Sequence, residues 1–155
     1  MCGPEVTNRP RGGALAALSA PKNGHHVPSS CFTQGDLAFH TPGQPGSTEA
    51  THARLTPAEA CRLADVDKLR VVIHSSGDMT KSAHDCGLFR QFVFPAARLS
   101  NNYVEFPLSS PLSLEVGNGG IIGRRVSVSS RSESGPEVVI AEGIVGFNFL
   151  EQPSL

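Results

Sequence analysis

The sequence has no apolar run long enough to cross a membrane, which needs about 20 mostly apolar residues in a helix. Residues 1–20 also lack the apolar segment of a secretory leader, because Pro4, Pro10 and the Gly12-Gly13 pair interrupt them. Both absences argue against insertion into a membrane and against secretion. We therefore expect an intracellular protein without membrane partners.

Paired cysteines and strong net charge are missing too. The four cysteines stand far apart, at positions 2, 31, 61 and 86, which is typical of reduced thiols rather than of a disulfide framework. The formal net charge is −1, so the chain as a whole is not a polycation, although one basic face can still lie opposite an acidic one.

Residue patterns that mark catalytic or metal sites are also absent. His74, His84 and Cys86 form the one metal-like group, but they lack the paired spacing of a zinc site. Residues 117–123 have the glycines of a phosphate-binding loop without the Lys-Ser or Lys-Thr that should follow, and a loop between two strands explains them better. None of the serines lies in a Gly-x-Ser-x-Gly turn. We expect no enzymatic activity, no metal and no cofactor.

Residues 1–50 contain half of the 12 prolines and few bulky apolar residues. This composition predicts a disordered N-terminal extension that is dispensable for folding. Its one apolar run, Ala14 to Leu18, is compatible with a turn of helix or part of an organelle leader. Residues 151–155 are expected to form a short polar tail.

Residues 53–150 show the patterns of a folded, β-rich domain. Thr56 and Pro57 resemble the first residues of a short helix, with Glu59 at the capping-box position. Strands are expected at 69–73, 88–94, 103–108, 113–116, 124–130, 138–141 and 144–150. The last three segments predict a C-terminal antiparallel hairpin or meander.

The predicted fold class is therefore α+β, mainly an antiparallel sheet with one or two short helices. The core is expected to contain apolar residues from several of these strands: Val72, Phe89, Phe92, Val126, Val128 and Phe147. Arginines and lysines spread through this domain could share one surface.

The order of these motifs resembles the N-terminal half of a eukaryotic sliding-clamp subunit. The resemblance rests on Glu59-Ala60-Cys61, Leu69 to Ile73, Ala83, the string Gly87 to Phe92, Tyr103 to Leu108 and Glu142 to Val145. Within this superfamily, which includes proliferating cell nuclear antigen, the match is most similar to the Rad-one subunit of the nine-one-one checkpoint clamp. Members begin with a strand and a long helix on the inner rim of the ring, and a complete subunit has two such domains.

The resemblance implies half of a clamp-like subunit, without enzymatic activity, that serves in DNA-damage checkpoint signalling or repair in the nucleus. Its partners would be other clamp subunits and the backbone of double-stranded DNA. We assign the DNA contact to a basic face formed by some of Arg54, Arg62, Lys68 and Lys81. The edge of the C-terminal hairpin would pair with a neighbouring subunit.

A second interpretation comes from the strand series that ends at Phe147. It predicts a small hot-dog-like or β-sandwich domain that binds a small ligand or a protein partner. A hot-dog fold needs a long buried helix, and the sequence after Gly77 contains no segment suited to form one.

Overall fold

The computed structural model describes residues 12–21, 34–57, 68–81, 83–95, 103–117, 119–131 and 137–148. These residues form nine strands and one short 3-10 helix, η2 (Ala83–Cys86). The strands are β1 (Ala14–Leu18), β2 (Gly35–His40), β3 (Glu49–Pro57), β4 (Lys68–Ile73), β5 (Arg90–Pro95), β6 (Val104–Val116), β7 (Gly120–Ile122), β8 (Arg125–Arg131) and β9 (Glu137–Phe147).

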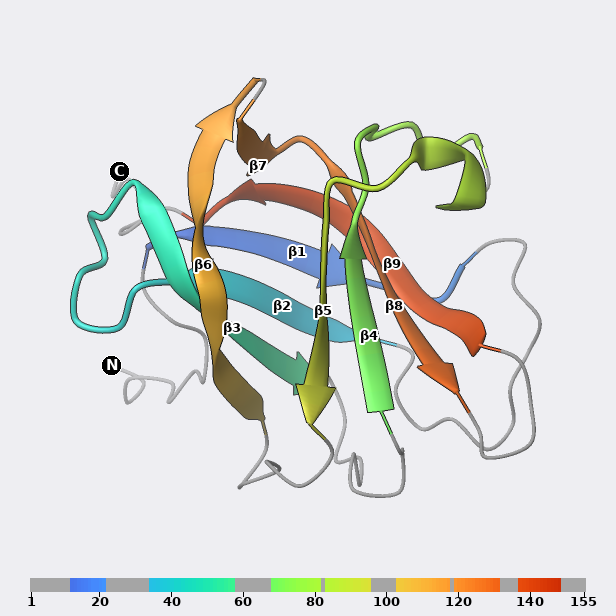
Figure 1. Ribbon diagram of the computed structural model, residues 1–155, viewed down its shortest axis with the longest axis horizontal. Coiled ribbons are helices and arrows are strands. Elements are labelled where there is room, and N and C mark those ends of the chain that lie inside the picture. The colour runs from blue at the N-terminus through green and yellow to red at the C-terminus, as the bar shows by residue number, and fades with distance from the viewer. Residues whose placement is uncertain are drawn as a thin grey trace, which may run out of the picture.

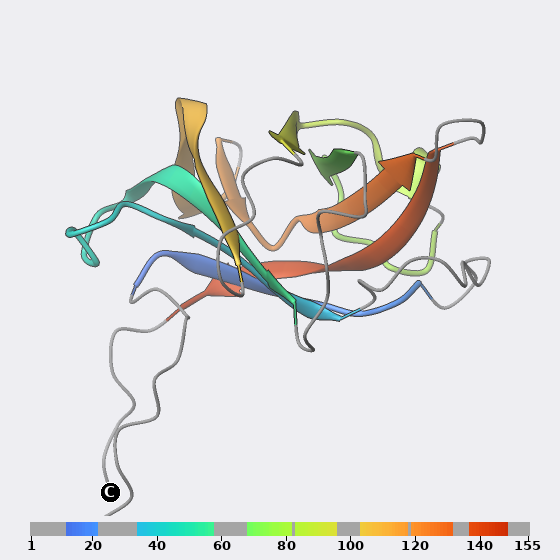
Figure 2. The same ribbon diagram turned by 90° about the horizontal axis from the view of Figure 1, so that it is seen from below.

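All nine strands belong to one sheet, in the order β5-β4-β8-β9-β1-β2-β3-β6-β7. Neighbouring strands are antiparallel except for β6 and β7, which are parallel. Figures 1 and 2 show that the sheet curls into a half-barrel. The curl brings Phe92 of β5 against Phe39 of β2, with ring centroids 6.1 Å apart in an edge-to-face arrangement. The concave face therefore closes over its own core.

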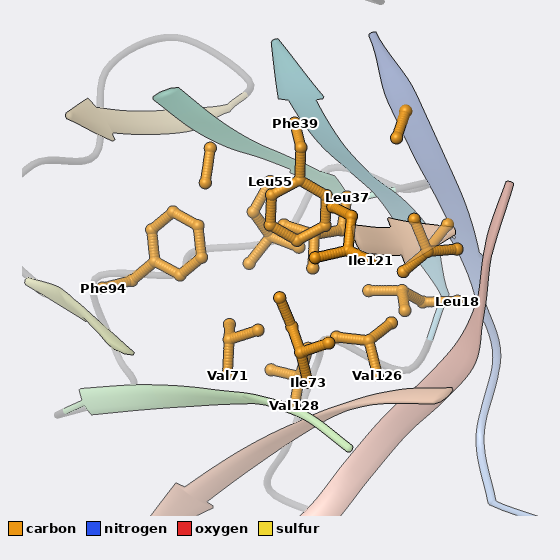
Figure 3. Packing of buried hydrophobic residues seen from close by; sticks show 14 of the residues in the cluster. Leu18, Leu37, Phe39, Leu55, Val71, Ile73, Phe94, Ile121, Val126 and Val128 are labelled. Carbon is orange, nitrogen blue, oxygen red and sulfur yellow. The ribbon is translucent and has the colours of Figure 1, made fainter. Parts of the chain in front are cut away.

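The core fills the concave side with small and branched apolar residues. Along β1, alternate residues Ala14, Ala16 and Leu18 are buried, as expected for a strand with one face on the core. Figure 3 shows Leu37, Phe39 and Leu55 from one half of the sheet meeting side chains of β4 and β8 from the other half. Because side chains fill this space, the surfaces suited to binding lie on the outside of the sheet and at its ends.

The predicted core residues lie in four different environments in the structure. Val126 and Val128 are fully buried, and Phe89 and Phe92 are partly buried against the core. Val72 is half-buried and alternates with the core-facing Val71 and Ile73, which places it on the outer face of β4. Phe147 is 50% exposed at the end of β9.

The prediction that residues 1–50 form a disordered extension is wrong for the segments that make β1 and β2. β1 pairs with β9 on one side and β2 on the other, and β2 pairs with β3, so both strands lie inside the sheet. Gly13 precedes β1 with φ at 75°, and a Cβ there would lie 2.2 Å from the Phe39 carbonyl oxygen. Gly13 in the segment predicted to be disordered thus allows two strands to approach closely.

The predicted α+β class is also wrong, because the described residues contain no α-helix. Thr56 and Pro57, expected to begin a helix, are the last residues of β3, and Glu59 lies outside the described residues, as does the expected tail at 151–155. The backbones of Thr56 and Pro57 pair with Asp36 and Gly35 of β2, so strand pairing overrides the local helix signal. Half of a clamp-like subunit, with its long helix, is not the architecture of the described residues.

The C-terminal antiparallel hairpin is confirmed as β8 and β9. Its expected role as a free edge is wrong for residues 142–147, because β1 and Ser19 pair with the other side of β9 there. Among the described strands, the sheet ends instead at β5 and at β7. These two strands are the ends of the described sheet at which a partner strand could pair.

Candidate nucleic-acid interface

Positive charge collects on the two strands at one end of the sheet. The sequences of β4 and β5 contain Lys68, Arg70 and Arg90 and no acidic residue. Arg70 and Arg90 are exposed, and the Arg70 Nη1 atom donates to Oε1 of Gln91 on β5 at 3.3 Å. We call this region, defined by Arg70, Arg90 and Gln91, the basic edge. Strand pairing places Arg70 and Gln91 on the outer face of the sheet, and Arg90 at the start of β5 on the face that it shares with Ile73.

An aromatic ring fixes one arginine of the basic edge. The Arg90 guanidinium lies 4.4 Å from the centroid of the Phe89 ring, and its Nη1 donates to the Phe89 carbonyl at 2.8 Å. Arg124 lies over the same ring at 3.8 Å. Both guanidinium groups therefore contact the Phe89 ring. A cation–π contact orients a guanidinium without neutralising its charge.

Arg124 joins the loops around this stack. Its Nε donates to the Gly120 carbonyl at 2.6 Å, Nη1 to the Ser75 carbonyl at 2.8 Å and Nη2 to the Gly117 carbonyl at 3.2 Å. These carbonyls belong to the turn after β4 and to the segment that leads from β6 into β7. The glycine-rich segment 117–123 therefore presents carbonyl oxygens to a cation. A phosphate-binding loop does the opposite, because it presents backbone N–H groups to an anion.

We predict that Arg124→Lys destabilises the fold by about 2 kcal/mol, because lysine keeps the charge but cannot donate to three separated carbonyls. Urea unfolding followed by circular dichroism measures the change. Arg70→Lys, which alters an exposed arginine on the same end of the sheet, is the control and should stay within about 0.5 kcal/mol of the parent. An Arg124→Lys variant as stable as the control would show that these hydrogen bonds contribute nothing.

The four residues predicted to contact DNA do not form one surface in the described part of the chain. Arg62 lies outside the described residues, and of Lys68 only the backbone in β4 is described. Lys81 is exposed in the loop after β4, beside Asp78. Hydrogen bonds from the Thr80 hydroxyl and amide lower the pKa of Asp78, with a smaller contribution from Lys81. The Asp78 carboxylate therefore lies near Lys81 and offsets its charge. Arg54, the fourth residue, lies on β3.

Arg54 belongs to a polar cluster on β2, β3 and β6. Its Nε donates to Glu105 Oε1 at 2.9 Å, the same oxygen lies 2.7 Å from His40 Nε2, and the guanidinium covers the Tyr103 ring at 4.2 Å. Burial raises the pKa of Glu105, but the hydrogen bonds from Arg54 and His40 outweigh burial and lower it. The ion pair with Glu105 makes Arg54 a weak candidate for binding phosphate.

His40 in this cluster is buried, and its burial lowers its pKa below the ordinary 6.5 despite the bond to Glu105. In the unfolded chain His40 therefore binds a proton near pH 6.5, whereas in the folded protein it binds one only at lower pH. We predict that stability is full above pH 6.5 and is lost as the pH falls through the depressed pKa. Unfolding midpoints in urea between pH 7.5 and about pH 5 measure this loss. His40→Gln can still donate to Glu105 and should reduce the dependence of the unfolding midpoint on pH in this window. An unchanged pH dependence would show that other groups cause it.

A second polar cluster, which the sequence did not reveal, lies beneath the segment 74–88. Arg125 is buried and its Nη2 donates to Glu142 Oε1, while Nη1 donates to the carbonyls of Lys81 at 2.6 Å and Asp78 at 3.2 Å. Burial lowers the pKa of Arg125, but the hydrogen bond to Glu142 reverses this and raises it. The thiol of Cys86 packs against the same guanidinium, with 3.5 Å between Nη1 and Sγ.

His74 and Ser127 complete this buried cluster. The His74 Nδ1 atom lies 2.8 Å from the Gly87 carbonyl, so it carries the proton and donates, and Nε2 accepts from the Ser127 hydroxyl at 2.8 Å. Ser127 is 2% exposed, which keeps its hydroxyl from reaching a substrate. The sequence signal that could have indicated this cluster is the alternation of polar and apolar residues in 124–130. It places residues 125, 127 and 129 on the face opposite Val126 and Val128.

Metal-binding groups and membrane-spanning helices are not found among the residues that the structure describes. In that part of the chain, no group of three or more His, Cys, Asp or Glu residues could bind a metal ion. No helix there is long and apolar enough to cross a membrane.

No protein-family model matches this sequence, and no curated protein sequence matches it either.

Proposed function

We propose that this protein is a non-enzymatic binding protein whose basic edge contacts the phosphate backbone of nucleic acid. The observation that carries the proposal is the exposed Arg90 at the start of β5, which contacts an uncharged ring and a carbonyl on a strand whose sequence contains no acidic residue. Contact with phosphates requires cations on one surface and no catalytic group. With a net charge of −1, such binding has to be local to this edge.

The environments of the other arginines support the choice of this edge. Arg54 and Arg125 donate to the carboxylates of Glu105 and Glu142, which offset their charge. Arg90 contacts an uncharged ring and a carbonyl, so its full positive charge remains available at the surface. A guanidinium fixed in this way also loses less conformational entropy when it binds a phosphate.

The proposal concerns backbone contact alone. The resemblance to sliding clamps implied a long helix on the inner rim of a ring, and the described residues contain no α-helix. In this proposal the basic edge contacts the nucleic-acid backbone through the two strands at one end of the sheet, β4 and β5.

We predict that binding to a labelled oligonucleotide weakens steeply as salt increases, and that Arg70→Ala/Arg90→Ala lowers the slope of log K against log salt by about 1 to 2, because two phosphate contacts are lost. Fluorescence anisotropy at several salt concentrations measures the slope. Arg54→Gln, which removes an arginine already paired with Glu105, is the control and should leave the slope unchanged.

Two results contradict the proposal. One is binding that is absent or insensitive to salt. The other is a slope that falls with Arg54→Gln and stays unchanged in the Arg70→Ala/Arg90→Ala variant, since this would place the contact on β3.

A further inference from the structure

Exposed apolar side chains lie near the exposed arginine at the start of β5. Leu88 is 56% exposed and Val93 is 42% exposed, and between them lie Arg90 and Gln91, which are also exposed. Surfaces that bind only a duplex backbone need cations alone, whereas surfaces for single strands alternate cations with groups on which bases stack.

The guanidinium of Arg90 is positioned to act as such a stacking group. Its Cζ atom lies over the Phe89 ring, 4.4 Å from the centroid, and the Cζ atom of Arg124 lies over the same ring at 3.8 Å. The bond from Nη1 to the Phe89 carbonyl fixes its plane. Its second face points away from the ring, and an unpaired base can stack on a guanidinium plane as it does on an aromatic ring.

We propose that the ligand of the basic edge is single-stranded nucleic acid, with one base stacked on Arg90 beside Leu88. This inference rests on the proposed function, since it names the class of nucleic acid that the same edge binds. A base in a duplex is stacked on both sides and cannot reach Arg90, so the duplex would use only the charges of the edge.

Charge alone favours the opposite order of affinities, because a duplex carries the higher density of phosphates. A preference for single strands therefore reports contacts to bases. The test uses fluorescence anisotropy with three probes of about 20 nucleotides, longer than the site sizes of single-strand binding folds: a single strand, the matching duplex and an abasic single strand with the same phosphates.

The expected result is tighter binding to the single strand than to the duplex, and weaker binding to the abasic strand by about 5- to 150-fold, which corresponds to the stacking of one base. Arg90→Lys keeps the charge and removes the planar group, so it should weaken binding to the normal strand by about fivefold or more and leave the abasic strand unaffected. Arg54→Lys, at a position outside the basic edge and paired with Glu105, is the matched control and should change neither.

Equal binding of the normal and abasic strands, or an Arg90→Lys variant that binds the normal strand as the parent does, would overturn the inference and leave backbone binding intact. Absence of salt-dependent binding to all three probes would overturn the proposed function and, with it, this inference. Circular dichroism of each variant confirms that the sheet is retained.

Discussion

Deletion of residues 1–50 should leave a chain that does not fold. The deletion removes β1 and β2, which connect β9 to β3 in the middle of the sheet. Both flanking strands would then expose unpaired backbone groups, and the core would lose the fully buried Leu37 and Phe39 together with the apolar residues of β1. Burial of a large side chain contributes about 1.5 to 3 kcal/mol, and a domain of this size has about 5 to 15 kcal/mol in all.

Circular dichroism and a urea titration of the truncated chain measure this effect. The expected result is loss of the β-sheet spectrum and of any cooperative transition. Deletion of residues 1–11 is the matched control, because it leaves every pairing of β1 in place, and this variant should unfold with the parent's midpoint. A truncation of 1–50 that keeps the parent's midpoint would contradict the position of β1 and β2 in the middle of the sheet.

Glu142→Gln should destabilise the protein by about 3 to 5 kcal/mol, because it leaves the Arg125 charge buried without a carboxylate. The loss extends beyond the pair, since Arg125 also donates to the carbonyls of Lys81 and Asp78 and thereby holds the segment 74–88 on the sheet. The Nε atom of Arg125 is already buried without a hydrogen-bond partner, so the site has little further capacity to satisfy the guanidinium.

A double variant distinguishes the cost of leaving one buried charge unpaired from the cost of replacing both side chains. Arg125→Met/Glu142→Met replaces both charges by apolar side chains and should recover much of the stability that Glu142→Gln loses. Glu115→Gln, at an exposed position on β6, should stay within about 0.5 kcal/mol of the parent. Urea unfolding gives all three values, and a Glu142→Gln variant as stable as Glu115→Gln would show that the ion pair does not matter.

The strands that could be predicted from sequence are those with dense β-branched or alternating residues. Expected strands at 69–73, 88–94 and 124–130 correspond to β4, β5 and β8 within a few residues. Expected pairs of shorter strands merge into the long β6 and β9, because Pro111 and Gly143, which lie between the expected strands, are themselves strand residues.

The missed strands have weak local signals and depend on distant partners. Ala14 to Leu18 has small side chains that fit a strand between β9 and β2, and no local pattern reveals that the partner Val145 lies far along the chain. Thr56 and Pro57 carry a genuine helix-start pattern, but β2 fixes their backbone as a strand. Long-range pairing decided the structure at both places.

The same reason limits how far the site could be predicted. The positions of the arginines in the sequence do not show that Arg54 is paired with Glu105 or that Arg125 is buried against Glu142. The contacts of Arg90 and Arg124 with Phe89 join residues that are adjacent in sequence with one that is distant, and the pairing of β4 with both β5 and β8 brings them together. Alternation in 124–130 was present in the sequence, but it did not reveal the buried polar cluster on the second face.

The claim that the basic edge is the contact surface is tested most directly by NMR chemical-shift mapping on addition of a short single-stranded oligonucleotide. We predict that the largest shifts fall on residues 88–93, Arg70 and the Arg124 side chain, and that they fade as salt is added. Largest shifts around Arg54 and Glu105 on β3 and β6, with the basic edge unchanged, would contradict the claim.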